Sequence, residues 1–523
     1  MTMTDTTLDK NKRDLVIHPF LFSCLPVLLL LAFNTHEIFL LGAINPLVIS
    51  VLLSFIVWVV LRRFLKSVKA GLILSWIILM ILIHGNVSKL LESEYSQFNL
   101  NFVLLPIFLI MGVLGTVFFV KIKANSELNS IFNVVAITIF VILVSIFLIY
   151  NSSQIFQYVD DSNVLEIPVL VNDIQKKPDV FVFLLDEFAS EKQLEMDFNY
   201  SLKPFITQLE ERDFIVPDLT FTNYPNTIFS IPSSLNMKYA DDVIEKYQSD
   251  SKDIRVSYPL LKHNNVMKIF KAYGYEITVF ANGFEGRFSM PADSPYIDEK
   301  LCDSNLVDIG IMLTLVDIYL PMPKGANLTH QFTGYNYYHH FDQCAFSFIE
   351  DYKDDKEQPH FVYTHLMLPH WPYRYDSEGN NVNPTSTPND ANAKYFKEGA
   401  YIDQVIFTEK KSLEMIDSIQ KQNPESIIII FSDHGMRGEI TSWENPTDKD
   451  LIRGFNNISA LYFPDKEIEI PKKLSLVNIF RIFFNEYFDT HYEILEDRHI
   501  WYNDEEPFIN KDVTNRLNSL IRD

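Results

Sequence analysis

The first 150 residues alternate between long apolar segments and short polar connections. A helix needs about 20 predominantly apolar residues to cross the hydrocarbon core of a bilayer. Five segments that contain no Asp, Glu, Lys or Arg meet or approach that length, at residues 15–33, 40–61, 70–83, 102–120 and 128–150. The third is short and needs its flanks, out to Val87, to cross. The pattern predicts five transmembrane helices.

Basic residues lie almost entirely on one side of these segments. Nine Lys or Arg residues precede the first segment or lie in the loops after the second and fourth, and the opposite loops hold only Lys89. Since loops rich in Lys and Arg stay in the cytoplasm, the N-terminus is predicted to be cytoplasmic. After five crossings the rest of the chain would be periplasmic or extracellular. We therefore expect a multi-pass protein of the plasma (inner) membrane.

From residue 178 onward the pattern changes to short apolar runs that alternate with helical spacing. Buried strands are expected at 179–185, 275–281, 360–366 and 426–432, because these runs are short and rich in β-branched or aromatic residues. Helices are expected between them, at 201–213, 259–274 and 400–422. Such alternation predicts a largely parallel sheet with helices on both faces, an α/β/α sandwich.

The predicted organisation is a membrane domain (1–150), a linker (151–177) and an extracytoplasmic domain (178–523). Residues 320–345 and 376–397 are rich in Asn, Pro and Tyr and read as long surface insertions. The first 150 residues carry 10 Lys/Arg and 7 Asp/Glu, whereas the remainder carries 34 and 60, a net charge of −26. Such an acidic domain is not expected to bind nucleic acid through phosphate contacts.

Three cysteines are present. Cys24 lies in an apolar segment and is most simply a small buried hydrophobe. Cys302 and Cys344 lie in the second part of the chain, where an oxidising compartment would allow them to pair. Sequence spacing does not distinguish a disulfide from two free thiols.

Acidic and imidazole side chains follow the predicted strands. Asp186 and Glu187 end one apolar run, Asp433 and His434 end another, and His370 lies shortly after a third. In parallel α/β sheets ligands bind beyond the carboxyl ends of the strands. Buried carboxylates need a neutralising partner, and carboxylate with imidazole suits Zn²⁺ or Mn²⁺. Either pair alone could be a strand-end turn or a helix cap; their combination predicts a single divalent metal site.

A metal site of this kind needs a group to activate. Residues 222–237 offer five hydroxyls, on Thr222, Thr227, Ser230, Ser233 and Ser234. A metal-bound hydroxyl loses its proton more easily and becomes a nucleophile. A Ser/Thr-rich helix N-terminus would explain the same composition, and such a terminus also favours a bound phosphate.

Four motifs in this order resemble the alkaline-phosphatase superfamily: LLDE at 184–187, TxxSxP at 227–232, HxxxxHxP at 365–372 and SDHG at 432–435. The chain is similar in particular to its membrane-anchored sulfatase-like branch, which includes lipid A phosphoethanolamine transferases and lipoteichoic acid synthases. Members of that branch also have five membrane helices before an extracytoplasmic catalytic domain. The resemblance thus covers nearly the whole chain and implies a domain of alkaline-phosphatase/sulfatase type.

The resemblance implies roles for individual residues. Thr227 would be the nucleophile and would bind one zinc or manganese ion together with Glu187, Asp433 and His434. Asp186 matches the first acid of the Asp pair in true sulfatases and joins the expected metal ligands. The substrate's phosphate group would be contacted by His370, by Ser230 and by a basic residue, for which we expect Arg453. His370 is also a candidate catalytic residue, which would protonate a leaving alkoxide.

The chain departs from the resembling families at two places. Formylglycine sulfatases need an Arg where this chain has Ser234, which argues against that chemistry. Phosphoethanolamine transferases carry another His about a dozen residues beyond the DHG motif, and here no His lies between His434 and His491. Arg437 or Arg453 would then meet the phosphate charge, although Arg437 could equally pair with neighbouring acids.

Three further residues near the motifs have a supporting role in this interpretation. His365 lies within its predicted strand and reads more simply as a core residue than as a ligand. Tyr401 and Asp403 lie on the helix before the DHG motif, where they could support the ligands.

The leading functional hypothesis is transfer of a phospho-group from a phospholipid donor to an envelope glycan or lipid, through a phospho-threonine intermediate. The alternatives are a hydrolase of the same fold, acting on phosphodiesters or sulfuric esters, and a non-catalytic membrane scaffold. The sequence does not identify the transferred group or the acceptor.

Overall fold

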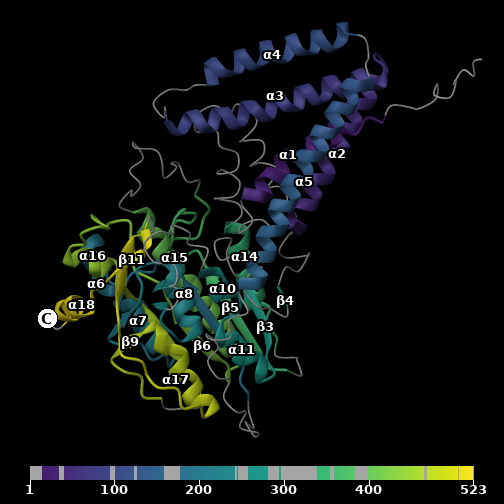
Figure 1. The fold of residues 1–523 in the computed structure, drawn as a ribbon. Coiled ribbons are helices and arrows are strands. Elements are labelled where there is room, and N and C mark those ends of the chain that lie inside the picture. Colours follow the sequence, from purple (N-terminus) through teal and green to yellow (C-terminus); the bar gives the residue numbers. More distant parts are fainter. Residues whose placement is uncertain are drawn as a thin grey trace, which may run out of the picture. The chain divides into compact units, whose positions relative to one another are not determined.

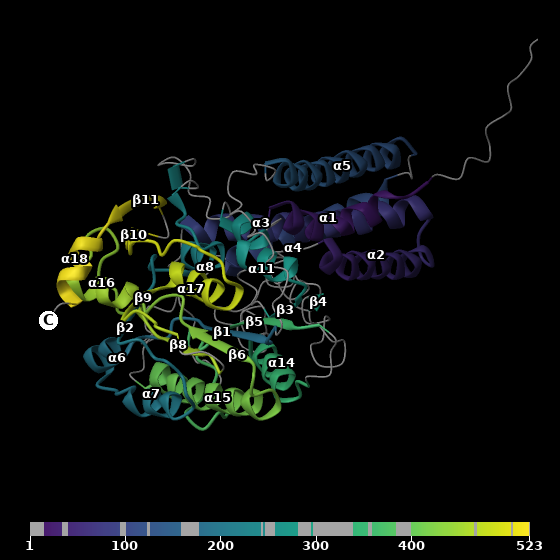
Figure 2. The ribbon, with the colours of Figure 1, turned by 90° about the horizontal axis from the view of Figure 1, so that it is seen from below.

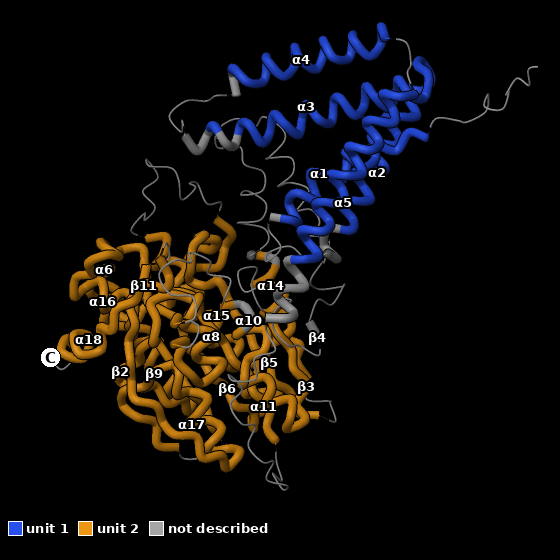
Figure 3. Tube along the Cα trace, viewed as in Figure 1, with its two compact units in different colours: residues 1–159, 304–333 blue, residues 160–303, 334–523 orange. Residues whose placement is uncertain are grey.

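The computed structural model describes residues 15–33, 40–94, 101–122, 126–157, 177–241, 244–245, 257–280, 294–295, 338–353, 358–382, 399–464, 468–503 and 506–521. The chain divides into two compact units (Figure 3). One contains the N-terminal helices and the other contains the described strands, and each is considered by itself.

The first unit consists of helices that coincide with the predicted apolar segments (Figure 1): α1 (His18–Phe33), α2 (Leu40–Arg62), α3 (Ser67–Glu94), α4 (Asn101–Lys121) and α5 (Ser126–Gln157). Among the described residues, four helices are long and apolar enough to cross a membrane, and α1 with its 16 residues is shorter. The flanks of the third segment do join its helix, which has 28 residues. The chain is a membrane protein; of the five predicted spans, four meet the length criterion.

Two asparagines of α5 satisfy backbone groups at the start of α1. Asn133 Oδ1 accepts hydrogen bonds from the N–H groups of Ile17 (3.2 Å) and His18 (3.0 Å), while its amide donates to Leu15 O (2.7 Å). Asn129 donates to the same carbonyl (2.9 Å). Because the first N–H groups of a helix have no partner inside it, these contacts fix α1 to α5 without exposing polar backbone.

The second unit is built on a six-stranded sheet whose order is β4-β3-β5-β1-β6-β8. Its strands are β1 (Val180–Leu185), β3 (Glu276–Phe280), β4 (Ser294–Pro295), β5 (His360–Leu366), β6 (Ile427–Phe431) and β8 (Ser459–Tyr462). All neighbours are parallel except β6 and β8. The four predicted strands are confirmed. Leu184 of β1 pairs in register with His365 of β5 and Phe431 of β6, so these strands end side by side.

Helices cover both faces of this sheet (Figure 2). Alternate residues of β1 point to opposite sides: Phe181, Phe183 and Leu185 pack into one core cluster, and Val180, Val182 and Leu184 into the other. The first cluster includes residues of α6 (Glu191–Phe198), α7 (Lys203–Glu210), α14 (Tyr338–Glu350) and α15 (Ala400–Gln422). The second includes residues of α8 (Thr227–Asn236), α10 (Tyr258–Lys262), α11 (Asn265–Ala272) and α17 (Leu476–Phe488). The predicted α/β/α sandwich is confirmed.

Smaller elements complete the second unit. A three-stranded sheet has the order β7-β2-β9, formed by Asn456–Asn457, Leu219–Phe221 and Lys473–Ser475. An antiparallel pair joins β10 (Ile500–Asn503) to β11 (Glu506–Asp512), and two further helices are α16 (Asp448–Phe455) and α18 (Thr514–Ile521). The sequence pattern did not predict these smaller sheets and helices.

The structure also bears on the predictions for the helix 259–274, the insertions and the cysteines. The expected helix 259–274 is interrupted, because Asn264 caps α11 by accepting a hydrogen bond from the N–H of Met267 (2.9 Å). The expected insertion 320–345 is wrong for 338–345, which are helical in α14, while 320–337 and 383–397 lie outside the described residues. Cys24 is a buried free thiol and Cys344 is disulfide-bonded; Cys302 lies outside the described residues.

Candidate metal centre and active site

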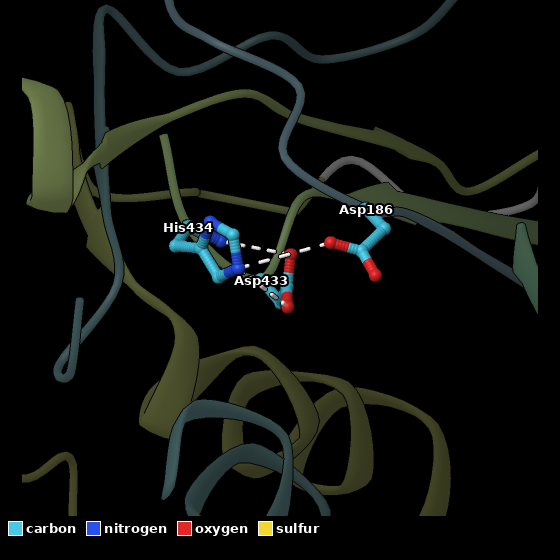
Figure 4. A group of neighbouring side chains, drawn as sticks. All are labelled: Asp186, Asp433 and His434. Carbon is cyan, nitrogen blue, oxygen red and sulfur yellow. Dashed lines mark hydrogen bonds and ion pairs between the residues drawn. The ribbon is translucent and has the colours of Figure 1, made fainter. Parts of the chain in front are cut away.

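Three of the predicted metal ligands meet at the carboxyl end of the central strands (Figure 4). Asp186 directly follows β1, and Asp433 and His434 follow β6, which lies beside β1. Ligand atoms of these three buried side chains all lie within 4.8 Å of one another. Because parallel neighbours present their carboxyl ends at the same edge, residues about 250 positions apart become neighbours.

The orientation of His434 is fixed by its own turn. Nδ1 lies 2.9 Å from the carbonyl oxygen of Gly435, which can only accept, so Nδ1 must carry the proton. The lone pair then belongs to Nε2, which faces Asp433 Oδ2 at 3.3 Å and Asp186 Oδ1 at 3.7 Å. A hydrogen bond of this kind from the other ring nitrogen is the usual support of a metal-binding histidine.

The hydroxyl of Thr227 lies against this cluster. Thr227 is the first residue of α8 and is half-buried, and Oγ1 donates to Asp433 Oδ2 at 2.7 Å. Oγ1 also lies 3.3 Å from His434 Nε2. The preceding residue, Asn226, is extended (φ −157°, ψ 165°), so the chain enters the helix at this residue. The structure thus brings Thr227 to the three ligands.

Ser230 has a different position from the one expected. Its Oγ donates to the backbone carbonyl of Asp433 (2.6 Å) and lies 2.7 Å from Oγ1 of Thr222. The side chain is buried, with 1% exposure. Ser230 therefore connects α8 to the segment of Asp433 and His434, and these contacts argue against the prediction that it binds substrate.

Burial and mutual charge set the protonation of the cluster. Burial, together with the nearby charge of Arg437, holds the pKa of His434 well below its usual value, so the imidazole is neutral and can act as a ligand. Burial and the neighbouring Asp186 raise the pKa of Asp433. Burial opposes ionisation of Asp186 as well, but His370, His365 and His434 hold its pKa below the ordinary range.

These residues fit a divalent cation. One neutral imidazole nitrogen and two carboxylates supply the donor set that Zn²⁺ or Mn²⁺ uses in proteins. Among the described residues, Asp186 Oδ1 is fully buried and has no hydrogen-bond partner. Burying a carboxylate oxygen without a partner costs free energy. This oxygen of Asp186 lies on the side that faces His434.

Glu187 lies beside this group rather than in it. Its Oε1 accepts from the N–H of Arg437 (2.7 Å), and its Oε2 lies 3.6 Å from His370 Nε2. Its backbone N–H donates to Asp433 Oδ1 (3.2 Å). The φ angle of 62° is left-handed and costly for a side chain of this type, and strain of this kind concentrates at functional sites. Among the described residues, the ligand atoms that lie within 4.8 Å of one another belong to Asp186, Asp433 and His434, and Glu187 as a further ligand stays a prediction.

His370, predicted as a site residue, and His365, predicted as a core residue, both lie at the site. The backbone N–H of His370 donates to the carbonyl of Asp186 (3.1 Å), and its ring faces Glu187. His365 is fully buried, as expected of a core residue, but its Nε2 lies 3.2 Å from Asp186 Oδ2. His365 therefore orients the carboxylate of Asp186, a predicted ligand, and its place inside a strand gave no sign of this contact.

The structure gives Arg453 another role than the expected one. Its guanidinium forms a two-pronged pair with Asp197, with Nε–Oδ2 at 2.9 Å and Nη2–Oδ1 at 2.7 Å. Nη1 donates to the carbonyl of Glu439 and approaches Asp450 Oδ1 at 3.4 Å. This engagement argues against Arg453 as the residue that meets the phosphate charge.

Further residues support the site, and one of them, Gln193, was not singled out from the sequence. Gln193 of α6 pairs its side-chain amide with both backbone groups of Met436, accepting at 3.0 Å and donating at 2.6 Å. A Cβ on Gly435 would lie 2.3 Å from the carbonyl of Arg453, so close backbone packing requires this glycine. Tyr401, an expected supporting residue, donates to Glu187 O (2.8 Å) and accepts from Ala189 N–H (3.2 Å).

Comparisons with known proteins agree with this fold. A family model described as Sulfatase matches residues 178–457. No curated protein matches the chain. Among solved structures, the C-terminal periplasmic domain of EcEptC from Escherichia coli in complex with zinc is 15% identical, with a TM-score of 0.42 over 66% of this chain and 96% of that one.

Two further solved structures are similar at the same low level. The lipoteichoic acid synthase LtaP from Listeria monocytogenes is 11% identical (TM-score 0.34; 63% of this chain and 76% of that one). The soluble domain of lipooligosaccharide phosphoethanolamine transferase A from Neisseria meningitidis is 14% identical (TM-score 0.33; 58% and 81%). Similarity at this level does not define a reaction.

Proposed function

Because the chain belongs to the sulfatase family, we propose that it transfers a phospho-group from a phospholipid to a glycan or lipid of the cell envelope. It is an enzyme of the sulfatase-like class, a transferase or a hydrolase. The observation that carries the proposal is the position of the Thr227 hydroxyl, 2.7 Å from Asp433 Oδ2 and 3.3 Å from His434 Nε2. A nucleophile must lie within such reach of the groups that activate it.

Asp186, Asp433 and His434 would hold the metal ion, with Glu187 close enough to join them. When bound, a zinc or manganese ion lowers the pKa of a coordinated hydroxyl and offsets charge on the transferring phosphoryl group. We propose zinc or manganese as this ion.

The first half-reaction uses the chain's own groups as follows. Thr227 Oγ1 donates a hydrogen bond to Asp433 Oδ2, and this carboxylate takes the proton as the oxygen attacks phosphorus. A bond forms between Thr227 Oγ1 and phosphorus as the bond from phosphorus to the diacylglycerol oxygen breaks. His370, half-buried beside Glu187, supplies a proton to that leaving oxygen.

The second half-reaction reverses these roles. A hydroxyl of the acceptor attacks the phosphorus of phospho-Thr227, His370 takes its proton, and the bond to Thr227 Oγ1 breaks. Asp433 returns its proton to Thr227 Oγ1, so the overall reaction exchanges one alcohol for another on the phosphodiester. Because covalent catalysis with one residue serves both halves, the enzyme returns to its starting state.

The membrane helices suit this chemistry. A lipid donor is confined to the bilayer, and a catalytic domain tethered to the same membrane stays within its reach. The Lys/Arg distribution supports a cytoplasmic N-terminus, which after five crossings would put the catalytic domain on the periplasmic or extracellular side.

A hydrolase of the same fold is the second candidate, and the family model itself favours it, since it is described as Sulfatase. Water would then replace the acceptor in the second half-reaction. Ser230 stands where a sulfatase-type motif carries its modified residue. Its side chain is buried and its hydroxyl donates a hydrogen bond to the backbone carbonyl of Asp433. This hydrogen bond and the burial of Ser230 favour Thr227 over Ser230 as the attacking group.

The test is turnover of a lipid donor by the full-length protein in detergent. Vesicles of phosphatidylethanolamine or phosphatidylglycerol are incubated with the protein and Zn²⁺ or Mn²⁺, and diacylglycerol is quantified. A transferase is expected to release diacylglycerol faster when an envelope glycan fraction is added, and a hydrolase at the same rate without it. No diacylglycerol from either lipid would overturn the proposal.

A further inference from the structure

One side chain of α15 forms hydrogen bonds with the backbone of the loop after β5, which carries His370. Gln404 is fully buried. Its Nε2 donates to the carbonyls of Pro369 and His370, both at 2.9 Å, and its Oε1 accepts from the N–H of Arg374 at 2.6 Å. One amide therefore fixes the backbone on both sides of the histidine.

A second buried side chain closes the same loop. The guanidinium of Arg374 donates to the carbonyls of Met367 (2.7 Å) and Pro372 (3.1 Å) and pairs with Asp342 of α14 (2.9 Å). Both Arg374 and Asp342 are at most 1% exposed. The loop 367–374 is thus braced by two helices, although it contains no regular structure of its own.

The brace connects to the metal centre. The N–H of His370 donates to the carbonyl of Asp186 (3.1 Å), whose carboxylate belongs to the ligand group. A shift of the 369–370 backbone would therefore move the His370 ring relative to Glu187 and the metal ligands. Misplacement of a reacting group by about 1 Å costs on the order of 100-fold in rate.

We propose that Gln404 is a positioning residue that holds the His370 ring at the reaction centre. The inference rests on the proposed function only for the role of His370; the brace itself is independent of the substrate. Gln404 does not touch the metal ligands in the described contacts, so its effect on the reaction passes through His370.

The test combines two measurements on the full-length protein. Gln404→Met has a similar volume and no hydrogen-bonding groups. We expect hydrogen exchange of the amides of 367–374 to accelerate and diacylglycerol release from phosphatidylethanolamine or phosphatidylglycerol vesicles to fall roughly 10- to 100-fold. Bound metal, measured by elemental analysis, should not change.

The decisive comparison is a double-mutant cycle with His370→Ala, which keeps the backbone carbonyl that Gln404 binds. If Gln404 acts through the ring, Gln404→Met causes no further loss of turnover in that background. An equal loss in both backgrounds would mean a general structural role and would overturn the proposal. Unchanged exchange in loop 367–374 would overturn it as well.

Two further variants serve as a replacement for Gln404→Met and as a control. If Gln404→Met does not fold, Gln404→Glu keeps the acceptor for Arg374 but replaces both donors with oxygen, and it should give the same pattern. Gln420→Met is the matched control on the same helix, because Gln420 donates to one carbonyl, that of Arg212 (3.0 Å). Absence of diacylglycerol formation by the wild type would count against the proposed function, while the exchange comparison still decides whether Gln404 braces the loop.

Discussion

Thr227 and Asp433 are 206 positions apart in the chain, yet Thr227 Oγ1 donates a 2.7 Å hydrogen bond to Asp433 Oδ2. The contact exists because the first residue of α8 lies in space next to the residues that follow β6. Ser230, one turn further along α8, reinforces the junction through the Asp433 carbonyl. The proposed nucleophile and the proposed metal ligand are therefore held by two separate hydrogen bonds between the same two segments.

Removal of a ligand carboxylate should remove the metal. Asp433→Asn and Asp186→Asn replace the two carboxylates of the cluster, and we expect purified protein to retain less than a tenth of the wild-type zinc or manganese by elemental analysis. Addition of a chelator should lower the thermal midpoint of the wild type but not of these variants, because ligand binding stabilises by about 2.7 kcal/mol at 100 times its Kd.

The matched control for this prediction is Asp179→Asn. Asp179 is also buried, but it lies just before β1, at the opposite end of that strand, and it accepts hydrogen bonds from Tyr352 and His360. Its replacement should leave the metal content unchanged. Full metal content in Asp433→Asn would contradict the ligand assignment.

His370 should matter most when the leaving group needs a proton. His370→Ala is expected to slow diacylglycerol release by roughly 10²- to 10⁴-fold, the usual range for general acid–base catalysis. Release of nitrophenolate from bis(4-nitrophenyl) phosphate should change far less, since nitrophenolate leaves as a stable anion. His491→Ala, at an exposed position, serves as control, and equal losses on both substrates would exclude the acid role.

Ser230 should be a positioning residue rather than a nucleophile. Ser230→Ala leaves the Asp433 carbonyl without its donor, so we expect a loss of about 1–3 kcal/mol in the free energy of unfolding and slower but persistent modification of Thr227. Ser234→Ala, in the same helix with one 3.3 Å hydrogen bond to Leu476 O, should have a smaller effect. Complete loss of covalent labelling in Ser230→Ala alone would contradict this assignment.

The sequence predicted four strands of the main sheet, β1, β3, β5 and β6, because each carries a direct signal; β4 and β8 were not predicted. The run 180–185 is apolar at every position, and it does fill both faces of the sheet. The following acids mark its carboxyl end, which is why Asp186, Asp433 and His434 could be brought together from pattern and resemblance. Thr227 was found by the same resemblance.

What the sequence could not predict depends on side-chain direction. Asp186 and Glu187 are adjacent, and the sequence does not show that Asp186 faces His434 while the carboxylate of Glu187 faces Arg437 and His370. Arg453 looked free in the sequence because its partner Asp197 lies 256 positions away. Gln404 carried no signal, since a buried glutamine that binds backbone carbonyls has no motif.

A carboxyl group remote from the metal centre predicts a pH dependence of stability. Burial, opposed by the hydrogen bond from Tyr200 and assisted by Glu191, raises the pKa of Glu409 to about 7. Between pH 4.5 and 7 the unfolded chain has lost this proton while the folded protein keeps it. Unfolding therefore releases a proton, and the free energy of unfolding falls as pH rises, by on the order of 2–3 kcal/mol from this group.

Glu409→Gln should remove that slope. Compared with the wild type, the variant is expected to be more stable at pH 8 and about equal at pH 4.5, in chemical denaturation followed by fluorescence. Glu414→Gln, at an exposed position of the same helix, should keep the wild-type slope. A wild-type stability that does not fall between these pH values relative to Glu409→Gln would contradict the raised pKa.

The most direct test is to locate the covalent intermediate. Full-length protein is incubated with phosphatidylethanolamine or phosphatidylglycerol vesicles and metal, quenched in acid, digested and mapped by mass spectrometry. A phospho-group adduct is predicted on Thr227 and on no other residue, and Thr227→Ala should carry none while it still binds metal. Undiminished labelling of Thr227→Ala would show that another residue attacks phosphorus and would contradict the account.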